Sequence, residues 1–281
     1  MTESQKTALK IRATKVRMNI IEGTFNAKSG HPGGSLSMAD VLTYIYSIMN
    51  IDPKNPKKED RDRFVLSKGH AAPGLYGILA EHGFFDKEEI KKLRKTDAML
   101  QGHPDMKGTP GVDMSTGSLG QGISAAAGMA LSAKLYNKDY KVYTVLGDGE
   151  IQEGQVWEAA MFAAHRKLDN LIAVVDNNNL QIDGAIDEIN SPYPIKEKFE
   201  AFGWHVIEIC AHCFTEIEDA FNEAKEIKGK PVCILQKSVK GKGVSFMENK
   251  CEWHGSAPNK EQYDIAMAEL TAKLTELGGT I

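Results

Sequence analysis

The chain has 281 residues, of which 42% are hydrophobic and 26% charged, and its formal net charge is −4 at pH 7. This length and composition predict one large α/β domain or two small ones. The small negative charge argues against nucleic-acid or membrane binding driven by bulk charge. The first residues lack the apolar core of a signal peptide, and no apolar run approaches the roughly 20 residues that span a bilayer. We therefore expect a cytoplasmic protein.

The N-terminal part of the chain predicts two helices separated by a loop. Apolar residues near helical spacing predict a helix from about Thr7 to Ala27. The next segment, SGHPGGS, is predicted to be a loop because glycine and proline dominate it. Ser35 or Ser37 is expected to cap a second helix that runs to about Met49.

A short strand and a long irregular region follow. Arg63–Ser67 is predicted to be a strand, and helices are expected through Leu75–Leu79 and from about Asp86. Residues 94–118 show no clear periodicity, and loops of this length in compact domains are usually functional or disordered. STGSLGQG, which ends at Gly122, then opens a helix of small residues that can pack close to a sheet.

The centre of the chain predicts a strand, a helix and a strand. Lys141–Leu146 and Leu171–Val175 are apolar runs of strand length, and the second is continuous, as in a strand buried on both faces. The helical window between them makes a βαβ unit the simplest arrangement. Asp148 follows the first strand and Asn177–Asn179 follow the second. In open α/β sheets ligands bind at the carboxyl ends of strands, so this carboxylate and these amides are expected to share one site.

The last part of the chain continues the alternation of strands and helices. Trp204–Ile209 and Pro231–Gln236 predict strands on either side of a helix over Phe214–Ile227, and a final helix is expected from Lys260 to about Leu277. We therefore predict an α/β fold with a mostly parallel sheet and helices on both faces. No linker or internal repeat is evident, so residues 1–281 are expected to form a single domain.

The four cysteines all lie in the last third of the chain, at Cys210, Cys213, Cys233 and Cys251. They do not resemble a disulfide framework, which favours a reducing compartment. Cys210 and Cys213 have the CxxC spacing of some zinc and redox sites, which the other two cysteines could complete. Because no second CxxC accompanies the first, we interpret the cysteines as incidental.

Four of the eight histidines lie beside glycine in irregular stretches: His31, His70, His103 and His254. A structural role is the commoner explanation for any one histidine. Four of them in loops near a predicted ligand site are better explained by an active site, because imidazole suits proton transfer and hydrogen bonding to hydroxyl groups near neutral pH.

The region from GDG at Gly147–Gly149 to the asparagine-rich strand end resembles the thiamine diphosphate motif. One carboxylate with neutral oxygens suits Mg²⁺, which takes its other ligands from phosphates and water. The resemblance implies that Asp148, Asn178 and the backbone carbonyl of Leu180 bind Mg²⁺, or Ca²⁺ or Mn²⁺, which bridges the diphosphate of the cofactor. It also implies the diphosphate-binding domain fold of thiamine diphosphate enzymes.

SGHPGGSLSMAD, LSKGHAAPGLY, QGHPD, STGSLGQG and a final HG occur in the order found in the N-terminal third of transketolases, and together they cover nearly the whole chain. The resemblance implies that His70 and His254 contact the cofactor diphosphate or the substrate. It implies that His31 and His103 bind ketose hydroxyls and assist proton transfer. The other implied cofactor-site residues are Gly117, Leu119, Gly149 and Glu153, the last matching an acidic residue at the subunit interface.

The implied activity is that of a transketolase, which transfers a two-carbon ketol unit from a ketose phosphate to an aldose phosphate, as in the pentose phosphate pathway. In that family a second domain binds the cofactor's pyrimidine ring, and no segment of this chain resembles it. We therefore expect the N-terminal subunit of a split transketolase, inactive alone and assembled with a C-terminal partner into an α2β2 heterotetramer.

Two alternatives to this activity remain open at the level of the sequence. One is a subunit of another thiamine diphosphate enzyme, similar to deoxyxylulose-phosphate synthase. The other is a non-catalytic subunit that binds the cofactor and regulates a partner.

Overall fold

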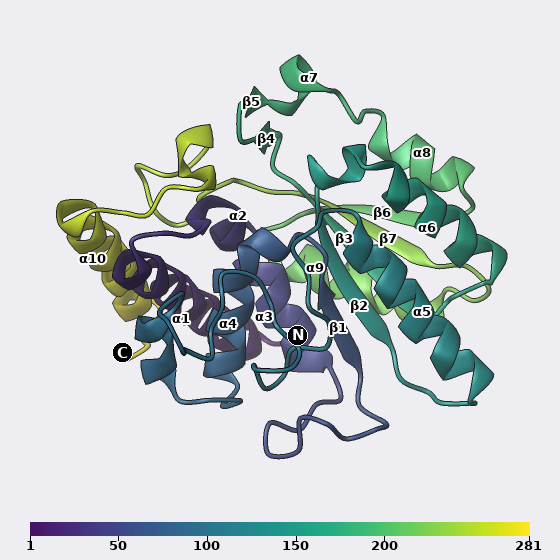
Figure 1. The fold of residues 1–281 in the computed structure, drawn as a ribbon, viewed down its shortest axis with the longest axis horizontal. Coiled ribbons are helices and arrows are strands. Elements are labelled where there is room, and N and C mark those ends of the chain that lie inside the picture. Colours follow the sequence, from purple (N-terminus) through teal and green to yellow (C-terminus); the bar gives the residue numbers. More distant parts are fainter.

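A five-stranded parallel sheet lies at the centre of the computed structural model, which describes residues 1–281 (Figure 1). Its strand order is β1-β2-β3-β7-β6, and every neighbouring pair is parallel. A small antiparallel hairpin follows β3. The strands are β1 (Arg63–Leu66), β2 (Val142–Gly147), β3 (Leu171–Asn177), β4 (Leu180–Gln181), β5 (Gly184–Ala185), β6 (His205–Cys210) and β7 (Val232–Lys237).

Helices cover both faces of the sheet, as the alternating sequence pattern predicts. One face carries α5 (Gln121–Leu135), α6 (Gly154–His165) and α8 (Ile195–Ala201). The larger core on the other face includes α1 (Glu3–Ala27), α3 (Ala39–Ile48), α4 (Ala72–Glu81), α9 (Phe214–Glu226) and α10 (Lys260–Glu276). The shorter elements are α2 (Pro32–Ser37), α7 (Ile186–Ile189), η1 (Gly69–Ala71), η2 (Lys87–Lys92), η3 (Glu150–Gln152) and η4 (Cys251–His254).

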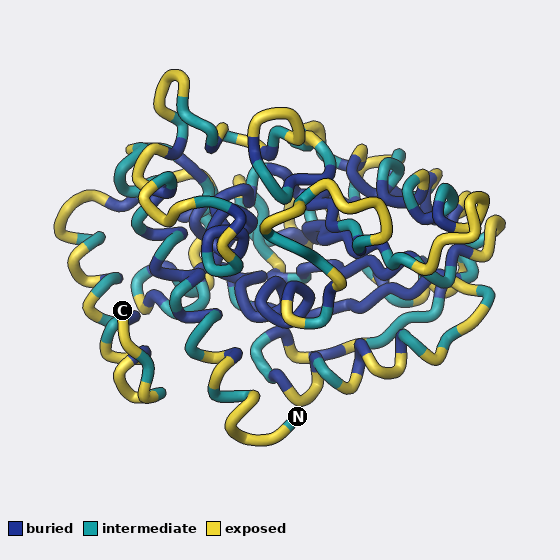
Figure 2. The backbone as a smooth tube through the Cα atoms, turned by 90° about the horizontal axis from the view of Figure 1, so that it is seen from below, coloured by how far each residue is buried: buried dark blue, intermediate teal, exposed yellow.

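Strand β3 shows why the sequence of the central strands is apolar throughout. Ile172 and Val174 point into the larger core, whereas Leu171, Ala173 and Val175 point into the core beneath α5 and α6. Both faces of the strand are therefore buried, which confirms the prediction for this run. Figure 2 shows the central strands as almost continuously buried, while the outer turns of the covering helices alternate with exposed residues.

The segment SGHPGGS, which was predicted to be a loop after the first helix, is irregular only up to His31. Its last four residues, Pro32–Ser35, begin α2, so the prediction is wrong there. Pro32 occupies the first turn of this helix, where a missing N–H is harmless and a fixed φ is favourable. Gly33 permits close packing, because a Cβ there would lie 2.7 Å from the carbonyl oxygen of Trp253. Neither Ser35 nor Ser37 caps α3, which follows Met38 without a side-chain cap.

The structure differs from the predicted elements in smaller ways as well, at features that the pattern of apolar residues does not reveal. Helix α1 begins at Glu3 because Thr2 and Gln5 form a capping box. The segment after Asp86 is the 3₁₀ helix η2, and neither α8 nor the β4–β5 hairpin was predicted. None of the helices is both long and apolar enough to cross a membrane.

Helix α5 packs very close to the end of β1, and this closeness depends on Gly122. A Cβ at this position would lie 2.5 Å from the Cα of Ser67. Gly128, two turns later on the exposed side of the same helix, has no atom within 4 Å of the position of its Cβ.

These two glycines make a matched test of the packing. Gly122→Ala should lower the free energy of unfolding by roughly 1–3 kcal/mol, because the backbone at Ser67, directly after β1, cannot move aside cheaply. Gly128→Ala should raise it by roughly 0.5–1 kcal/mol, because alanine loses less conformational entropy in a helix. Urea unfolding of both variants measures this difference, and a shift of both in the same direction would contradict the packing argument.

Candidate active site

A cavity of about 360 Å³ opens at the carboxyl ends of β2 and β3, where the sequence predicts a site. Asp148 follows β2 and Asn178 follows β3, and the two strands are paired up to Gly147 and Asp176. Both side chains line the cavity, so the βαβ unit brings the carboxylate and the amide together. Other lining residues include Lys68, His70, Leu119, Glu153, Lys240 and His254.

The carboxylate of Asp148 is buried, with 2% exposure, and is held by backbone donors. Its Oδ1 accepts the N–H of Gly149 at 2.9 Å, and its Oδ2 accepts the N–H of Asn179 at 2.6 Å. Burial raises its pKa to about 6, and the negative charge of Asp176 adds to the rise. A carboxylate in this position is stabilised in its charged form by a cation.

The predicted metal ligands form an oxygen set of the kind that Mg²⁺ prefers. The Oδ1 of Asn178 accepts the N–H of Leu180 at 3.2 Å and keeps a second lone pair. The carbonyl oxygen of Leu180 accepts a hydrogen bond from the ammonium of Lys240 at 2.9 Å, so a metal ion would share this oxygen with the lysine. The buried, poorly neutralised carboxylate and the two neutral oxygens fit a divalent cation such as Mg²⁺, Ca²⁺ or Mn²⁺.

Lys68 and Asp176 form a buried ion pair beside the cavity, which the sequence pattern did not reveal. The ammonium of Lys68 also donates to the carbonyl of Gly34 at 2.8 Å. Asp176 accepts hydrogen bonds from Ser37 at 2.6 Å and Ser238 at 2.5 Å. Burial alone would raise the pKa of Asp176, but the Lys68 ammonium and these hydrogen bonds outweigh it and lower the pKa to about 2.

Lys240 is the second buried lysine of the site, with 1% exposure. Its Nζ lies 2.9 Å from the carbonyl oxygen of Leu180 and 2.9 Å from the Nδ1 of His254. Burial lowers its pKa to about 8, so it is largely charged at neutral pH. Its acceptors are both neutral, so its charge favours an anionic ligand such as a diphosphate, whereas the ammonium of Lys68 is paired with Asp176.

Glu150 joins three segments at the floor of the site and was also missed. Its carboxylate accepts the hydroxyl of Ser67 at 2.5 Å and the N–H groups of Gly120 and Gly147, each at 3.0 Å. Burial raises the pKa of this carboxyl group. Glu150 therefore connects the end of β1, the start of α5 and the end of β2.

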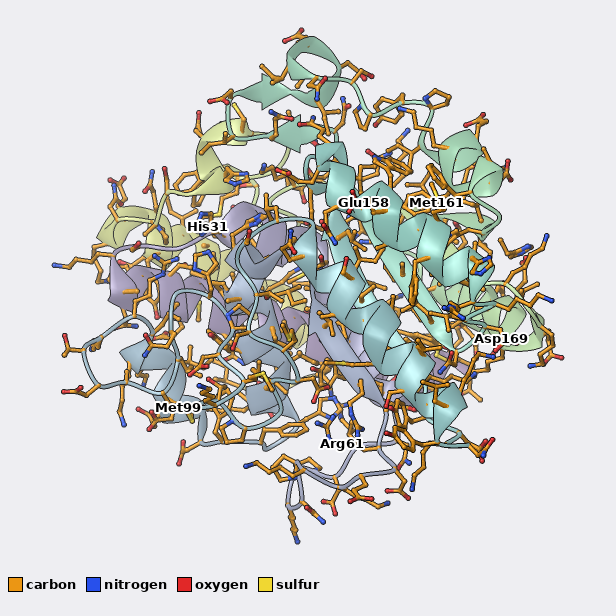
Figure 3. All side chains as sticks on the ribbon, turned by 45° about the vertical axis from the view of Figure 1, so that its right-hand side comes forward. His31, Arg61, Met99, Glu158, Met161 and Asp169 are labelled. Atoms are coloured by element: carbon orange, nitrogen blue, oxygen red, sulfur yellow. The ribbon has the colours of Figure 1, made fainter.

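Three of the four predicted histidines form one cluster. The ring centroids of His31 and His70 are 5.2 Å apart, those of His31 and His254 5.5 Å, and those of His70 and His254 5.0 Å. His31 lies at the start of α2, as Figure 3 shows, His70 in η1 and His254 in η4. Three segments that are far apart in the sequence therefore meet over the carboxyl edge of the sheet.

His103 lies beside this cluster against the backbone of Gly117. A Cβ at Gly117 would lie 3.0 Å from Cδ2 of the imidazole, and the φ of Gly117 is +149°, so a side chain is excluded here. Leu119, Gly149 and Glu153 line the cavity itself, whereas Gly117 is absent from its lining. The structure thus brings all the predicted site residues to one edge of the sheet.

The histidines are neutral at pH 7 because of their surroundings. Burial lowers the pKa of His31 to about 4, assisted by the positive charge of Arg94, and it lowers the pKa of His254 to about 3, assisted by Lys240. Burial also lowers the pKa of His70 and, with Arg94, that of His103. A neutral imidazole both donates and accepts a hydrogen bond, as proton transfer to a sugar hydroxyl requires.

The cysteines lie in different environments. Cys210 is exposed, Cys213 precedes α9, Cys233 is buried within β7 and Cys251 begins η4. Nowhere in the chain do three or more histidine, cysteine, aspartate or glutamate side chains gather in a way that could hold a metal ion.

Comparison with known proteins gives a consistent picture. Residues 8–273 match the family model described as "Transketolase, thiamine diphosphate binding domain". The chain is 48% identical to a Clostridium protein named 6-deoxy-6-sulfo-D-fructose transketolase subunit SqwG, covering 95% of this chain and 97% of that protein. It is 40% identical to one of the subunits of apulose-4-phosphate transketolase from Phocaeicola vulgatus, covering 97% of each.

Solved structures extend the similarity to larger enzymes. The structure superimposes on transketolase from Campylobacter jejuni with a TM-score of 0.90 and 33% identity, covering 99% of this chain and 46% of that one. This chain therefore spans less than half the length of that transketolase.

The histidine pKa values predict acid sensitivity. An unfolded histidine titrates near 6.5, so between that pH and the lower folded pKa values the unfolded state binds more protons, and stability falls as the pH falls. For the chain without cofactor, the free energy of unfolding should decrease from pH 7 to pH 4.5. His31→Gln should reduce this decrease, whereas His165→Gln, on the exposed end of α6, should not. Urea unfolding at several pH values measures both slopes, and equal slopes in the two variants would contradict the assignment.

Proposed function

The chain belongs to the transketolase family, and on this basis we propose that it is the N-terminal, thiamine diphosphate-binding subunit of a transketolase built from two kinds of chain. The observation that carries the proposal is the cavity that Asp148 and Asn178 line together with two buried lysines, beside the histidine cluster. The relatives named as transketolase subunits support it, because this chain matches them over nearly their whole length.

The proposed cofactor site uses the charged groups of the cavity. Asp148, Asn178 and the carbonyl of Leu180 would hold Mg²⁺, or Ca²⁺ or Mn²⁺, against the diphosphate. Lys240, which has only neutral acceptors, would supply positive charge beside that group, and Lys68 also lines the cavity. Leu119, Gly149, Gly117 and Glu153 would border the cofactor, and Glu153 would also face the partner. Thiamine diphosphate, when bound, supplies the carbon nucleophile that accepts the ketol unit.

The proposed role of the histidines follows from their position and neutrality. His70 and His254, stacked at the edge of the cavity, would hydrogen-bond to the diphosphate or to the substrate carbonyl. His31 and His103 do not line the cavity itself but lie next to these two histidines. They would bind ketose hydroxyls and move the proton of the hydroxyl that becomes a carbonyl. Their neutral state lets each accept such a proton near neutral pH.

The proposed assembly is an α2β2 heterotetramer in the cytoplasm. We propose that residues 1–281 form one diphosphate-binding domain and that the pyrimidine-binding domain is supplied by a C-terminal subunit. Positive charge for the acidic group of the substrate would also come from that subunit. The donor is proposed to be a ketose phosphate or a ketose carrying another acidic group, because the relatives are named for a sulfonated and a phosphorylated sugar. Membership of the pentose phosphate pathway remains a prediction.

A titration with the C-terminal subunit tests the assignment. The chain alone should show no ketol transfer from xylulose 5-phosphate to ribose 5-phosphate, because under this proposal the pyrimidine-binding half of the cofactor site comes from the partner. Activity should appear on addition of the partner and saturate at one partner per chain, with a mass corresponding to two copies of each. Replacing the donor with pyruvate tests the alternative related to deoxyxylulose-phosphate synthase. Full activity of the purified chain alone, or activity only with pyruvate, would refute the proposal.

Two sets of variants separate cofactor binding from turnover. In the assembled complex, Asp148→Ala should weaken Mg²⁺-dependent binding of thiamine diphosphate by roughly 2–5 kcal/mol, because a charged ligand is lost from a buried site. His31→Ala and His103→Ala should leave that affinity nearly unchanged and lower kcat by roughly 10²–10⁴-fold.

Calorimetry and steady-state kinetics measure the two effects. Asp169→Asn, which alters a partly exposed aspartate near the lower ends of α5 and α6 in Figure 3, is the control and should change neither quantity. Wild-type turnover in both histidine variants would show that the cluster is structural.

A further inference from the structure

A buried ionic network lies beneath the segment that carries Lys240 into the cavity. The guanidinium of Arg17, in α1, donates to Asp40, in α3, through Nη1 at 3.0 Å and Nη2 at 2.6 Å. The Nδ1 of His212, in the turn after β6, lies 2.7 Å from Oδ2 of the same carboxylate. Burial would raise the pKa of Asp40, but Arg17 and His212 hold it well below its usual range.

The partners of His212 fix its tautomer. Nδ1 faces the carboxylate of Asp40 and must carry the proton, whereas Nε2 accepts the backbone N–H of Val239 at 3.0 Å and must be unprotonated. The imidazole therefore connects the buried carboxylate of α3 to the segment after β7. Neither an ammonium nor an aliphatic side chain could make both contacts.

The segment Val239–Gly243 is held at both of its ends by this network. His212 holds the N–H of Val239, and the Nε of Arg17 donates to the carbonyl of Lys242 at 3.0 Å. Gly243 lies directly over Arg17, because a Cβ there would be 2.9 Å from Cδ of the arginine. Both holding groups are themselves bound to Asp40, so the three side chains act as one support.

Lys240 lies between the two held ends and points the other way, into the cavity. Its ammonium contacts the carbonyl of Leu180 and the ring of His254. His212, by contrast, does not line this cavity and instead lines a separate hollow on the other side of Asn177–Asn179. His212 is therefore connected to Lys240 by its hydrogen bond to the backbone of the segment at Val239.

We propose that His212, together with Asp40 and Arg17, is a positioning residue that sets the place of Lys240 and, through it, the orientation of His254 in the cofactor site. The inference rests on the proposed function for the identity of the ligand. The support itself is independent of that function, because every contact in it lies within this chain.

Two substitutions at His212 separate its two contacts. Asparagine places a donor near the position of Nδ1 and can keep the bond to Asp40, but it has no acceptor that reaches Val239. Glutamine places an acceptor near the position of Nε2 and can keep the bond to Val239. Asn should therefore release the segment, and Gln should largely retain it. His205→Gln is the matched control. His205 begins β6, the strand that precedes His212, and its ring pairs with the Glu223 carboxylate at 2.6 Å, far from the segment.

Hydrogen exchange on the full chain gives the first measurement, and it needs no activity. In His212→Asn the Val239 amide should exchange up to roughly tenfold faster, the value of one lost hydrogen bond, while amides within β3 keep their protection. The second measurement is the calorimetric affinity of the assembled complex for thiamine diphosphate with Mg²⁺. In His212→Asn this affinity should weaken roughly 10–100-fold, the effect typical of residues that orient the binding side chains without touching the ligand. His212→Gln, which keeps the bond to Val239 and loses the one to Asp40, should lie closer to the wild type than His212→Asn in both.

The outcomes are distinguishable. If the Asn variant keeps wild-type protection at Val239 and wild-type cofactor affinity, or if Gln loses both as fully as Asn does, the positioning role is wrong. If the Asn variant fails to fold by thermal melting, the Gln variant and its exchange pattern decide. If the wild-type complex neither binds the cofactor nor transfers ketol units, the proposed function fails, and the exchange result at Val239 still tests the support.

Discussion

The site depends on an imbalance of buried charge at the carboxyl edge of the sheet. Asp176 and Lys68 neutralise each other, and hydrogen bonds from Ser37 and Ser238 complete the surroundings of that carboxylate. Asp148 has only backbone donors, and Lys240 has only a carbonyl and an imidazole. Burying a charge without a full partner is unfavourable. The fold therefore holds, in one cavity, a carboxylate that favours a cation and an ammonium that favours an anion, and a metal–diphosphate pair complements both.

The same charges account for the state of the histidines. Burial lowers the pKa of the neighbouring imidazoles, and the positive charges of Lys240 and Arg94 lower it further by repulsion. An anionic ligand beside Lys240 opposes that repulsion and raises the histidine pKa values toward neutrality. General acid–base groups work best when their pKa is near the operating pH. Cofactor binding would therefore raise the pKa values of His254 and His70, which lie closest to Lys240, more than the pKa of His103.

The sequence predicted those parts of the fold and site that depend on periodicity and strand ends. The apolar run Leu171–Val175 implied a strand buried on both faces, and the residues after it implied a ligand site, because both inferences need only the local pattern. The helix α2 was missed because its glycines and proline signal a loop locally, whereas tertiary packing against Trp253 makes the tight turn favourable. Lys68 and Lys240 were missed for a related reason: a lysine is almost always exposed, and only the folded chain shows the carboxylate and carbonyl that permit its burial.

The unbalanced charges also link ligand binding to stability. A site that holds Asp148 with a pKa of about 6 destabilises the ligand-free fold relative to one in which that carboxyl group is satisfied. A ligand that binds only the folded state recovers this cost, with a gain that grows with its concentration relative to Kd. The support around Asp40 has the opposite character, because its charges are paired within the chain and need no ligand. In the proposed function the ligand completes the charges of the cavity, whereas the contacts of the support are already complete within the chain. Binding energy then need not be used to order the segment Val239–Gly243.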